Sequence, residues 1–195
     1  MAAMTLSLPI DPPANDLLNS SPLALLLGMV LDQQIPLEKA FTSPYVLTRR
    51  LGHEPTAAEL AGYDRNALVQ IFATPPALHR FPKAMADRVQ QVCRVLVERY
   101  GGDPAGLWAD ARTGQELLSR IGDLPGFGAQ KSQIFLALLG KRYDVRPQGW
   151  QAAAGAYGEP DAYRSVADIT DADSLARVRA YKQQLKAAAK AGPVG

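Results

Sequence analysis

The chain has 195 residues, of which 47% are hydrophobic and 21% are charged, so a disordered or low-complexity protein is excluded. Its net charge of +2 is too small to indicate a class of partner by itself. The single Cys93 excludes an internal disulfide framework and any four-cysteine iron–sulfur or zinc site. Because His53 and His79 are the only histidines, we expect no bound metal and no cofactor.

The N-terminal segment has no basic stretch ahead of an apolar one, as a secretion signal would have. The longest apolar run, PLALLLGMVL, is too short to span a bilayer. We therefore expect a soluble cytoplasmic protein without a membrane partner.

Helical spacing recurs along the chain whereas alternating β-branched runs are absent, which predicts an all-α fold. Ser21 and Pro22 are suited to begin a helix through LALLLGMVLDQQ, which Pro36 limits, and a further helix follows from LEKAF. The next two segments, TAAELAGY and DRNALVQIFA, predict short helices with Thr56 and Asp64 as N-caps.

Further helices are predicted after residue 80. After the proline-rich loop PPALHRFP, an apolar stripe runs to a stop at Gly101–Gly102; it consists of Met85, Val89, Val92, Leu96 and Tyr100. TGQELLSRIGDL follows with a capping-box pattern, Thr113 and Glu116. The tail is a Gly/Pro/Ala-rich loop and then a helix over about residues 174–189. After Asp173 the chain carries five cations without an acid among them: Arg177, Arg179, Lys182, Lys186 and Lys190.

The segment LPGFG joins two of the predicted helices and has the composition of an anion-binding turn. Gly126 and Gly128 flank an apolar Phe127 and allow close approach of the backbone to another surface. The following helix begins at once, so its free N–H groups can bind a phosphate without reading base sequence. The alternative is a plain helical hairpin whose glycines serve only tight packing.

The segment LPGFGAQKSQIFLALL resembles the helix-hairpin-helix of the helix-hairpin-helix-GPD superfamily of base-excision DNA glycosylases, which includes endonuclease III and the alkyl-purine glycosylases. Leu124, Pro125, Gly126, Phe127 and Gly128 form the hairpin turn, and Ser132 stands where alanine is usual. Two more segments agree in order, LLLGMVLDQQIPLEKAF and FPKAMADRVQQVCRVLVERYGG. The segments GMVLDQQIP and LHRFPKAMADRVQ are similar in sequence to those of an actinobacterial-type branch of these repair proteins.

The resemblance covers about residues 23–150 and implies two helical lobes with a cleft between them. Residues 39–140 would form the hairpin lobe, and residues 1–38 with 141–195 the other. It also implies double-stranded DNA as the partner of a monomer that joins the nucleoid when bound. Gln34, with Gln33 beside it, stands where the family inserts a side chain into the gap left by a flipped base.

Two positions depart from the family pattern. The lysine of bifunctional members is replaced by Gln130, and Lys131 is one residue late, which is a rotation of about 100° on a helix. We therefore expect no Schiff-base lyase, and expect Lys131 to contact phosphate or to be solvated. The essential aspartate is replaced by Gln148, which has no charge to offer.

Substitutes for the missing groups are weakly indicated. Asp144 is the nearest acid and would act only if the loop folds differently; Glu159 and Asp161 are further candidates on the next loop. Three aromatic residues are possible stacking partners for a flipped base, although core packing is the commoner role: Tyr143, Trp150 and Tyr157.

Three hypotheses follow. The first is a monofunctional DNA N-glycosylase, an enzyme best suited to cationic alkylated purines because these are already good leaving groups. The second is a DNA lesion-binding protein without catalysis, which Gln130 and Gln148 favour. The third is a protein-interaction module that uses the hairpin for a protein partner; its affinity would not fall steeply with salt, as DNA affinity does.

Overall fold

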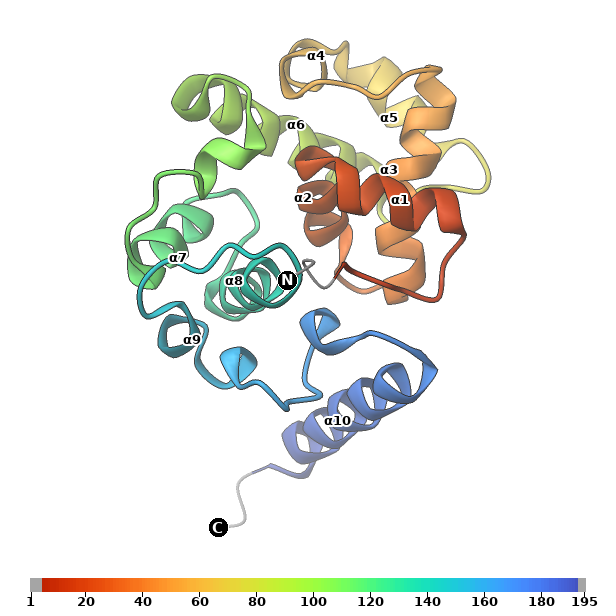
Figure 1. The fold of residues 1–195 in the computed structure, drawn as a ribbon. Helices are drawn as coiled ribbons and strands as arrows, with labels where there is room; N and C mark the ends of the chain where they lie inside the picture. Colours follow the sequence, from red (N-terminus) through yellow and green to blue (C-terminus); the bar gives the residue numbers. More distant parts are fainter. Residues whose placement is uncertain (1–4, 193–195) are drawn as a thin grey trace.

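The computed structural model describes residues 5–192, and within them the regular structure is helical, as the sequence predicts. Figure 1 shows the arrangement of the α-helices. Their bounds are α1 Pro12–Ser20, α2 Pro22–Leu31, α3 Leu37–Leu51, α4 Ala57–Gly62, α5 Arg65–Ala73, α6 Pro82–Tyr100, α7 Gly114–Gly122, α8 Ala129–Arg142, α9 Trp150–Ala153 and α10 Ala172–Ala191. Short 3₁₀ segments cover Pro104–Leu107 (η1), Gly155–Gly158 (η2) and Val166–Asp168 (η3).

Helix α2 lies at the centre of the N-terminal half. It begins at the Ser21 N-cap, whose hydroxyl accepts from the Ala24 N–H, and residues 23–31 are all buried. It packs on α1, α3, α6 and η1, while α4 and α5 pack on α6 (Figure 1). At Gly28 the backbone meets the ring of the fully buried Phe41 of α3.

The hairpin of α7 and α8, hereafter the α7–α8 hairpin, is packed against the segment that follows it, which contains α9, η2 and η3. Helix α8 packs on α7, α9, η2 and η3. The backbone of Gln148 pairs with α7, because its N–H donates to Arg112 O and its carbonyl accepts from the Gly114 N–H. The loop that the sequence predicts between residues 147 and 165 is therefore structured around the hairpin.

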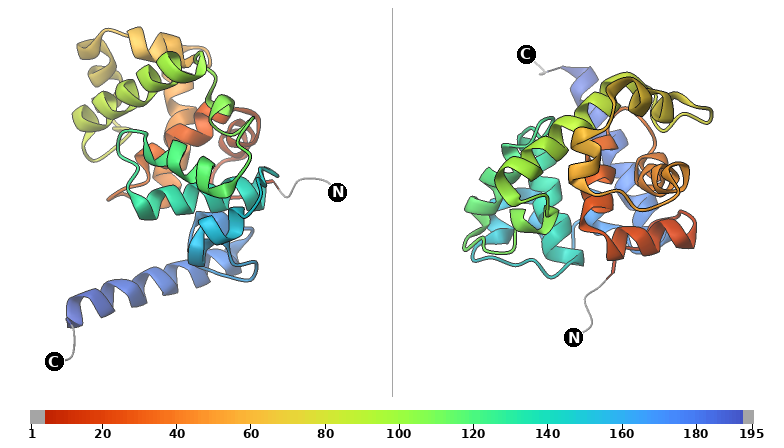
Figure 2. Two further views of the ribbon diagram at one scale, coloured as in Figure 1. Left: turned by 90° about the vertical axis from the view of Figure 1, so that its left-hand side faces the viewer. Right: turned by 90° about the horizontal axis from the view of Figure 1, so that it is seen from above.

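Helix α10 contacts the rest of the chain mainly through its N-terminal half. Leu175 and Val178 are buried, whereas residues 183–192 are exposed. In Figure 2, left, the C-terminal half of α10 stands apart from the other helices. A charged helix with one short apolar stripe is thus fixed at one end only.

The buried side chains form one continuous cluster that runs from Leu6 to Val178. The lobe boundaries expected at residues 39 and 140 fall inside α3 and α8, so no chain break or linker marks them. The outer ends of the expected second segment, residues 1–4 and 193–195, lie outside the described residues.

Most helix boundaries follow the signals in the sequence. Thr56 and Asp64 cap α4 and α5 through their side chains, and Gly101 ends α6 in the left-handed region. Thr113 caps α7, but the expected capping box is not closed, because the Glu116 carboxylate accepts from the Arg112 N–H instead. Helix α1 was not among the expected elements; it is held by Asn15 and Asn19, whose amides bond the backbone of residues 6–10.

Over residues 5–192, no single helix is both long and apolar enough to cross a membrane. Helices α1 and α2 satisfy those criteria only when taken together, and they are bent by 112° to each other.

We predict that Gly28→Ala lowers the free energy of unfolding by about 1–3 kcal/mol, because its Cβ would lie 2.6 Å from Cδ1 of Phe41 in a packed core. Gly62→Ala is the matched control, since a Cβ there meets nothing within 4 Å. Urea unfolding of both variants measures the difference. Equal stability of Gly28→Ala and the parent chain would contradict this account of the α2–α3 contact.

Candidate functional site

A groove of about 900 Å³ lies between α8 and α10 and is closed at one end by the turn that joins α2 to α3. Apolar residues from α2, α8, α10 and the end of η3 line it, among them Met29, Ile134 and Val178. Its polar lining contains five cations, two acids and three glutamines. It consists of Asp32, Gln33, Gln34, Glu38, Arg80, Gln130, Lys131, Arg179, Lys182 and Lys186.

The turn at residues 32–36, hereafter the α2–α3 turn, presents Asp32 to the groove. The Asp32 N–H still donates to Gly28 O, as the last residue of a helix does. The next N–H, of Gln33, donates to Leu31 O at 2.7 Å, and Asp32 has φ −74° and ψ 70°. These are the features of an inverse γ-turn centred on Asp32. The chain thus reverses directly after the buried helix, and its first charged side chain lies at the bend.

The Asp32 carboxylate is partly buried and forms no hydrogen bond or ion pair within the described part of the chain. Burial raises its pKa above the ordinary value, because the charged form loses water there. The positive charges of Lys182 and Lys131 act in the opposite direction. A carboxylate with raised pKa, open to a groove, is typical of sites that handle protons.

Lys131 reaches the same place from the first turn of α8. Its Nζ donates to the Val30 carbonyl at 3.3 Å, at the C-terminal end of α2, where the helix dipole favours a cation. It also lies 5.6 Å from the centre of the Phe127 ring. Burial lowers its pKa, which the nearby Asp32 charge partly offsets and Arg88 reinforces. Of the two expectations for Lys131, a phosphate contact stays a prediction, and the structure places the ammonium group in a partly buried position rather than free in solvent.

His79 and Gln33 hold the α2–α3 turn in place. The buried His79 receives the Phe81 N–H at Nδ1, at 3.0 Å, so Nε2 carries the proton and donates to Gln33 O. The Gln33 amide turns back to Val30 O and to Sδ of Met85. Gln33 is thus occupied inside the protein and is not free to enter DNA.

Gln34 is exposed at the rim of the groove, with φ 57°. Such a conformation is uncommon for a residue other than glycine, and it directs the side chain away from the body of the turn. Of Gln33 and Gln34, only Gln34 therefore has a side chain that is exposed and without a hydrogen-bond partner among the described residues. Phe81, 41% exposed, lies beside His79 and under the Arg80 guanidinium.

The α7–α8 hairpin presents an open helix N-terminus beside the groove. Leu124 and Phe127 are buried and anchor the turn, while Gly126, at φ 85°, and Gly128 are exposed. Gly128 is the N-cap of α8 and has no side chain to satisfy the first N–H groups of that helix. Four N–H groups and the helix dipole therefore meet solvent here, as an anion site requires.

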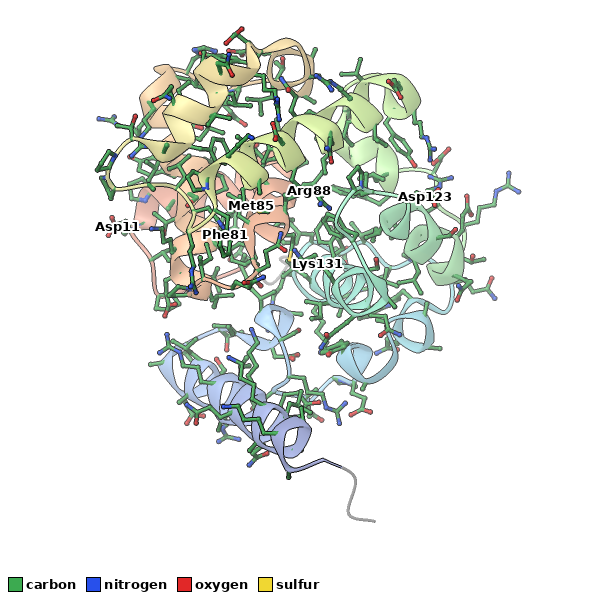
Figure 3. The ribbon with its side chains drawn as sticks, turned by 180° about the vertical axis from the view of Figure 1, so that it is seen from behind. Asp11, Phe81, Met85, Arg88, Asp123 and Lys131 are labelled. Atoms are coloured by element: carbon green, nitrogen blue, oxygen red, sulfur yellow. The ribbon has the colours of Figure 1, made fainter. Side chains whose placement is uncertain are left out.

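Arg88 of α6 covers the other side of this turn. A Cβ built on Gly126 would lie 2.5 Å from the Arg88 guanidinium, so Arg88 lies directly against the turn, and the backbone angle of Gly126 favours glycine. Figure 3 shows Arg88 and Lys131 facing one another across the gap between α6 and α8, with Phe81 and Met85 beside them. Within the described residues, Arg88 forms no ion pair, which leaves a positive charge at the hairpin.

Helix α10 supplies cations from the opposite wall. Arg179 binds Glu38 of α3 and thereby ties α10 to the N-terminal half, whereas Lys182 and Lys186 line the groove without an acidic partner in residues 5–192. Leu185 is 44% exposed between them. The basic tail expected from the sequence thus forms one wall of the groove.

Several residues expected at the site lie elsewhere. Gln148 is exposed, and its backbone pairs with α7 outside the groove, so this position does not present a side chain to Asp32 and Lys131. Asp144 is exposed and pairs with Arg146; its φ of 57° belongs to the end of α8, where Val145 N–H donates to Leu139 O. The expectation that Asp144 could replace the missing acid in the groove is not met by this loop.

The expected aromatic partners serve packing in this fold. The Trp150 ring lies on the backbone of Gly140, and the Tyr143 hydroxyl donates to Leu18 O at 3.0 Å, with its pKa raised by burial. Neither lines the groove. Tyr157 accepts a hydrogen bond from the Gln130 amide, so it is the one of the three at the groove's edge.

The further candidate acids are surface groups. Glu159 pairs with Arg164, and Asp161 lines a separate shallow pocket beside α10. Across residues 5–192, no three His, Cys, Asp or Glu side chains gather to hold a metal ion, and Cys93 is buried with its pKa raised to about 12.

Asp32 is the residue that sequence reasoning missed. Within DQQIP, attention goes to the two glutamines, yet the acid directly after nine buried residues is the one forced into a partly buried place. A charged residue that directly follows a wholly apolar helix is the signal that could have found it. Arg88 left no such signal, because its importance comes from the approach of α6 to Gly126 in space.

Comparisons with protein families, with curated proteins and with solved structures found no match to this chain.

We predict that the two histidines titrate on opposite sides of 6.5, the ordinary pKa. Burial lowers the pKa of His79, and the Glu59 hydrogen bond raises that of His53. Two imidazole signals in an NMR titration, assigned with His53→Gln, would measure this. Because the folded state resists protonation of His79, its contribution to stability should fall as pH drops below 6.5. A His79 pKa above 6.5 would contradict the buried neutral ring.

Proposed function

We propose that this protein binds damaged duplex DNA in base-excision repair and is a monofunctional DNA N-glycosylase. The observation that carries the proposal is the juxtaposition of two different sites. An uncapped helix N-terminus lies beside a groove that holds a desolvated carboxylate and a desolvated lysine. The first suits a backbone phosphate, and the second suits a nucleotide turned out of the duplex.

The distribution of charge supports a nucleic acid as the partner. Arg88, Lys131, Lys182 and Lys186 surround the hairpin and the groove, and none of them is neutralised by an ion pair among the described residues. Unpaired cations that converge from three helices favour a polyanion. Phosphate contacts of this kind fix the register of the protein on the duplex without reading sequence.

The rim and size of the groove support base flipping. Gln34 protrudes from the α2–α3 turn, and its amide can hydrogen-bond an orphaned base. The volume of about 900 Å³ falls in the range of clefts that hold small organic groups, which is about 300–1,000 Å³. A base would enter the groove between α8 and α10, next to the first turn of α8.

A second candidate, a lesion-binding protein without catalysis, is favoured by one observation. The family's acidic slot, Gln148, has an amide that is exposed outside the groove, and the family's lysine slot, Gln130, bonds Tyr157. The two functions share DNA binding and differ only in base release.

We predict that affinity for a duplex with a stable abasic-site analogue falls steeply with salt. Lys182→Gln combined with Lys186→Gln should reduce the slope of log K against log salt by about 1.8, since each lost phosphate contact accounts for about 0.9. Arg49→Gln is the matched control, exposed near the far end of α3, about 16 Å along the helix from Glu38. Fluorescence anisotropy measures all three. Affinity that is independent of salt would instead support a protein partner.

We also predict that Gly128→Asp stabilises the protein and weakens DNA binding. The N-cap angles, φ −74° and ψ 177°, accept any residue, and a Cβ there meets nothing within 4 Å. A carboxylate should cap α8 and gain about 0.5 kcal/mol, while it occupies and repels the phosphate site, at a cost of about tenfold or more in affinity.

Gly128→Ser is the control, because it caps the helix without adding charge. Thermal unfolding and anisotropy on the same samples separate the two effects. If Gly128→Asp bound DNA as well as Gly128→Ser does, the hairpin would not be a phosphate site.

A further inference from the structure

We propose that Asp32, at the end of α2, provides the catalytic carboxylate of base release, in place of the acid absent at Gln148. This inference rests on the proposed glycosylase function and deepens it, since it assigns the chemistry to the α2–α3 turn and selects cationic alkylated purines as the substrates.

The choice of Asp32 follows from the carboxylates within reach. Only Asp32 and Glu38 line the groove, and Glu38 is bound to Arg179. Asp144 and Glu159 form ion pairs outside the groove. Among the described residues, Asp32 is thus the one groove carboxylate whose oxygens remain open to a bound group.

The position of Asp32 relative to Lys131 favours a catalytic site and not a salt bridge that only stabilises the fold. The two charges influence one another's pKa, yet their N and O atoms are not within the 4.0 Å of a salt bridge. Lys131 instead donates to Val30 O and stays beside the carboxylate. Both residues line the groove, so a group bound there would lie against both charges.

The rigidity of the turn supports the same assignment. The inverse γ-turn, the His79 bond to Gln33 O and the Gln33 amide bonds leave the backbone around Asp32 without freedom to reorient. A catalytic group needs such support from its surroundings, and an exposed surface acid has none.

The reaction is a hydrolysis that needs no other reactant than water. The bond between C1′ and the base nitrogen breaks, and its electron pair neutralises the positive charge of the alkylated purine. A water oxygen bonds to C1′, and the proton lost by that water passes to the Asp32 carboxylate and then to solvent. Before the proton moves, the carboxylate also offsets the positive charge that develops on the sugar.

Cationic bases suit a site whose one open groove carboxylate is Asp32, because they are already good leaving groups. An alkylated purine leaves as a neutral molecule, so no acid is required to protonate it. In the proposed reaction Asp32 acts as a carboxylate and Glu38 is bound to Arg179, so the described lining offers no further carboxyl to protonate a neutral base such as uracil. The Asp32 carboxylate attracts the cationic base and the positively charged sugar, and it does not repel the neutral base that is released.

The experiment is a single-turnover assay with excess full-length protein on duplexes that carry 7-methylguanine, 3-methyladenine, uracil or 8-oxoguanine, with alkali added to reveal abasic sites. The parent chain should release the two methylated purines. Asp32→Asn should slow release by about a hundredfold or more. Asp144→Asn, which removes an exposed acid outside the groove, should leave the rate unchanged. Asp32→Glu, which keeps the charge one methylene further out, should recover part of the rate.

Affinity for the abasic-site duplex and thermal unfolding are measured on the same variants. Asp32→Asn should bind DNA at least as tightly as the parent, because a negative charge is removed, and its isosteric amide should keep the fold. Loss of release with binding intact, and partial recovery in Asp32→Glu, supports the assignment.

The other outcomes overturn it in distinguishable ways. If the parent chain does not bind DNA, the proposed function fails and the assignment falls with it. If the parent binds in a salt-sensitive way but releases neither methylated purine, lesion binding stands and Asp32 is not catalytic. If the bases are released and Asp32→Asn is as fast as Asp144→Asn, the glycosylase function stands and its carboxylate lies elsewhere.

Discussion

The complete burial of α2 is the constraint on which the rest of the structure depends. A helix that is apolar on every side has no face to offer water, so it must be covered all round. Helices α1, α3 and α6 and the segment η1 provide that cover, and Gly28 allows the ring of Phe41 to approach the backbone. The placement of α1, α3 and α6 around α2 in Figure 1 is the consequence of this requirement.

The same constraint explains the electrostatics at the end of α2. The chain must leave the core directly after Leu31, and Asp32 is its first charged residue, so desolvation is imposed on the carboxylate by its position. The open carbonyls at that end attract a cation, and Lys131 of α8 donates a hydrogen bond to one of them, Val30 O. One contact thus joins the α7–α8 hairpin to the N-terminal half and brings two desolvated, opposite charges into one groove. In the proposed function, the contact of Lys131 with the end of α2 therefore places the reacting base next to the phosphate site.

The sequence predicts the helices better than it predicts the site, and the difference has a physical cause. Caps such as Thr56 and Asp64 and the stop at Gly101 act within one turn of chain, so their signals are local. The direction of Lys131 depends on where α8 meets α2, some hundred residues away in sequence, and a rotation argument on an isolated helix does not contain that information. Helix α1 was missed for a related reason, since its asparagines are secured by the chain that precedes it.

The hairpin prediction and the Gln148 prediction differ in the same way. The residues of LPGFG form a turn by their own conformational preferences, and in the structure Leu124 and Phe127 are buried while Gly126 and Gly128 are exposed. Residue 148, by contrast, is engaged through its backbone N–H and carbonyl, which secure the N-terminus of α7. Any side chain satisfies those two bonds, so the fold places no demand for a carboxylate there. A protein that keeps this bridge and still releases bases must draw its negative charge from another wall of the groove, and the α2–α3 turn is the wall where burial, support and an unpaired carboxylate coincide.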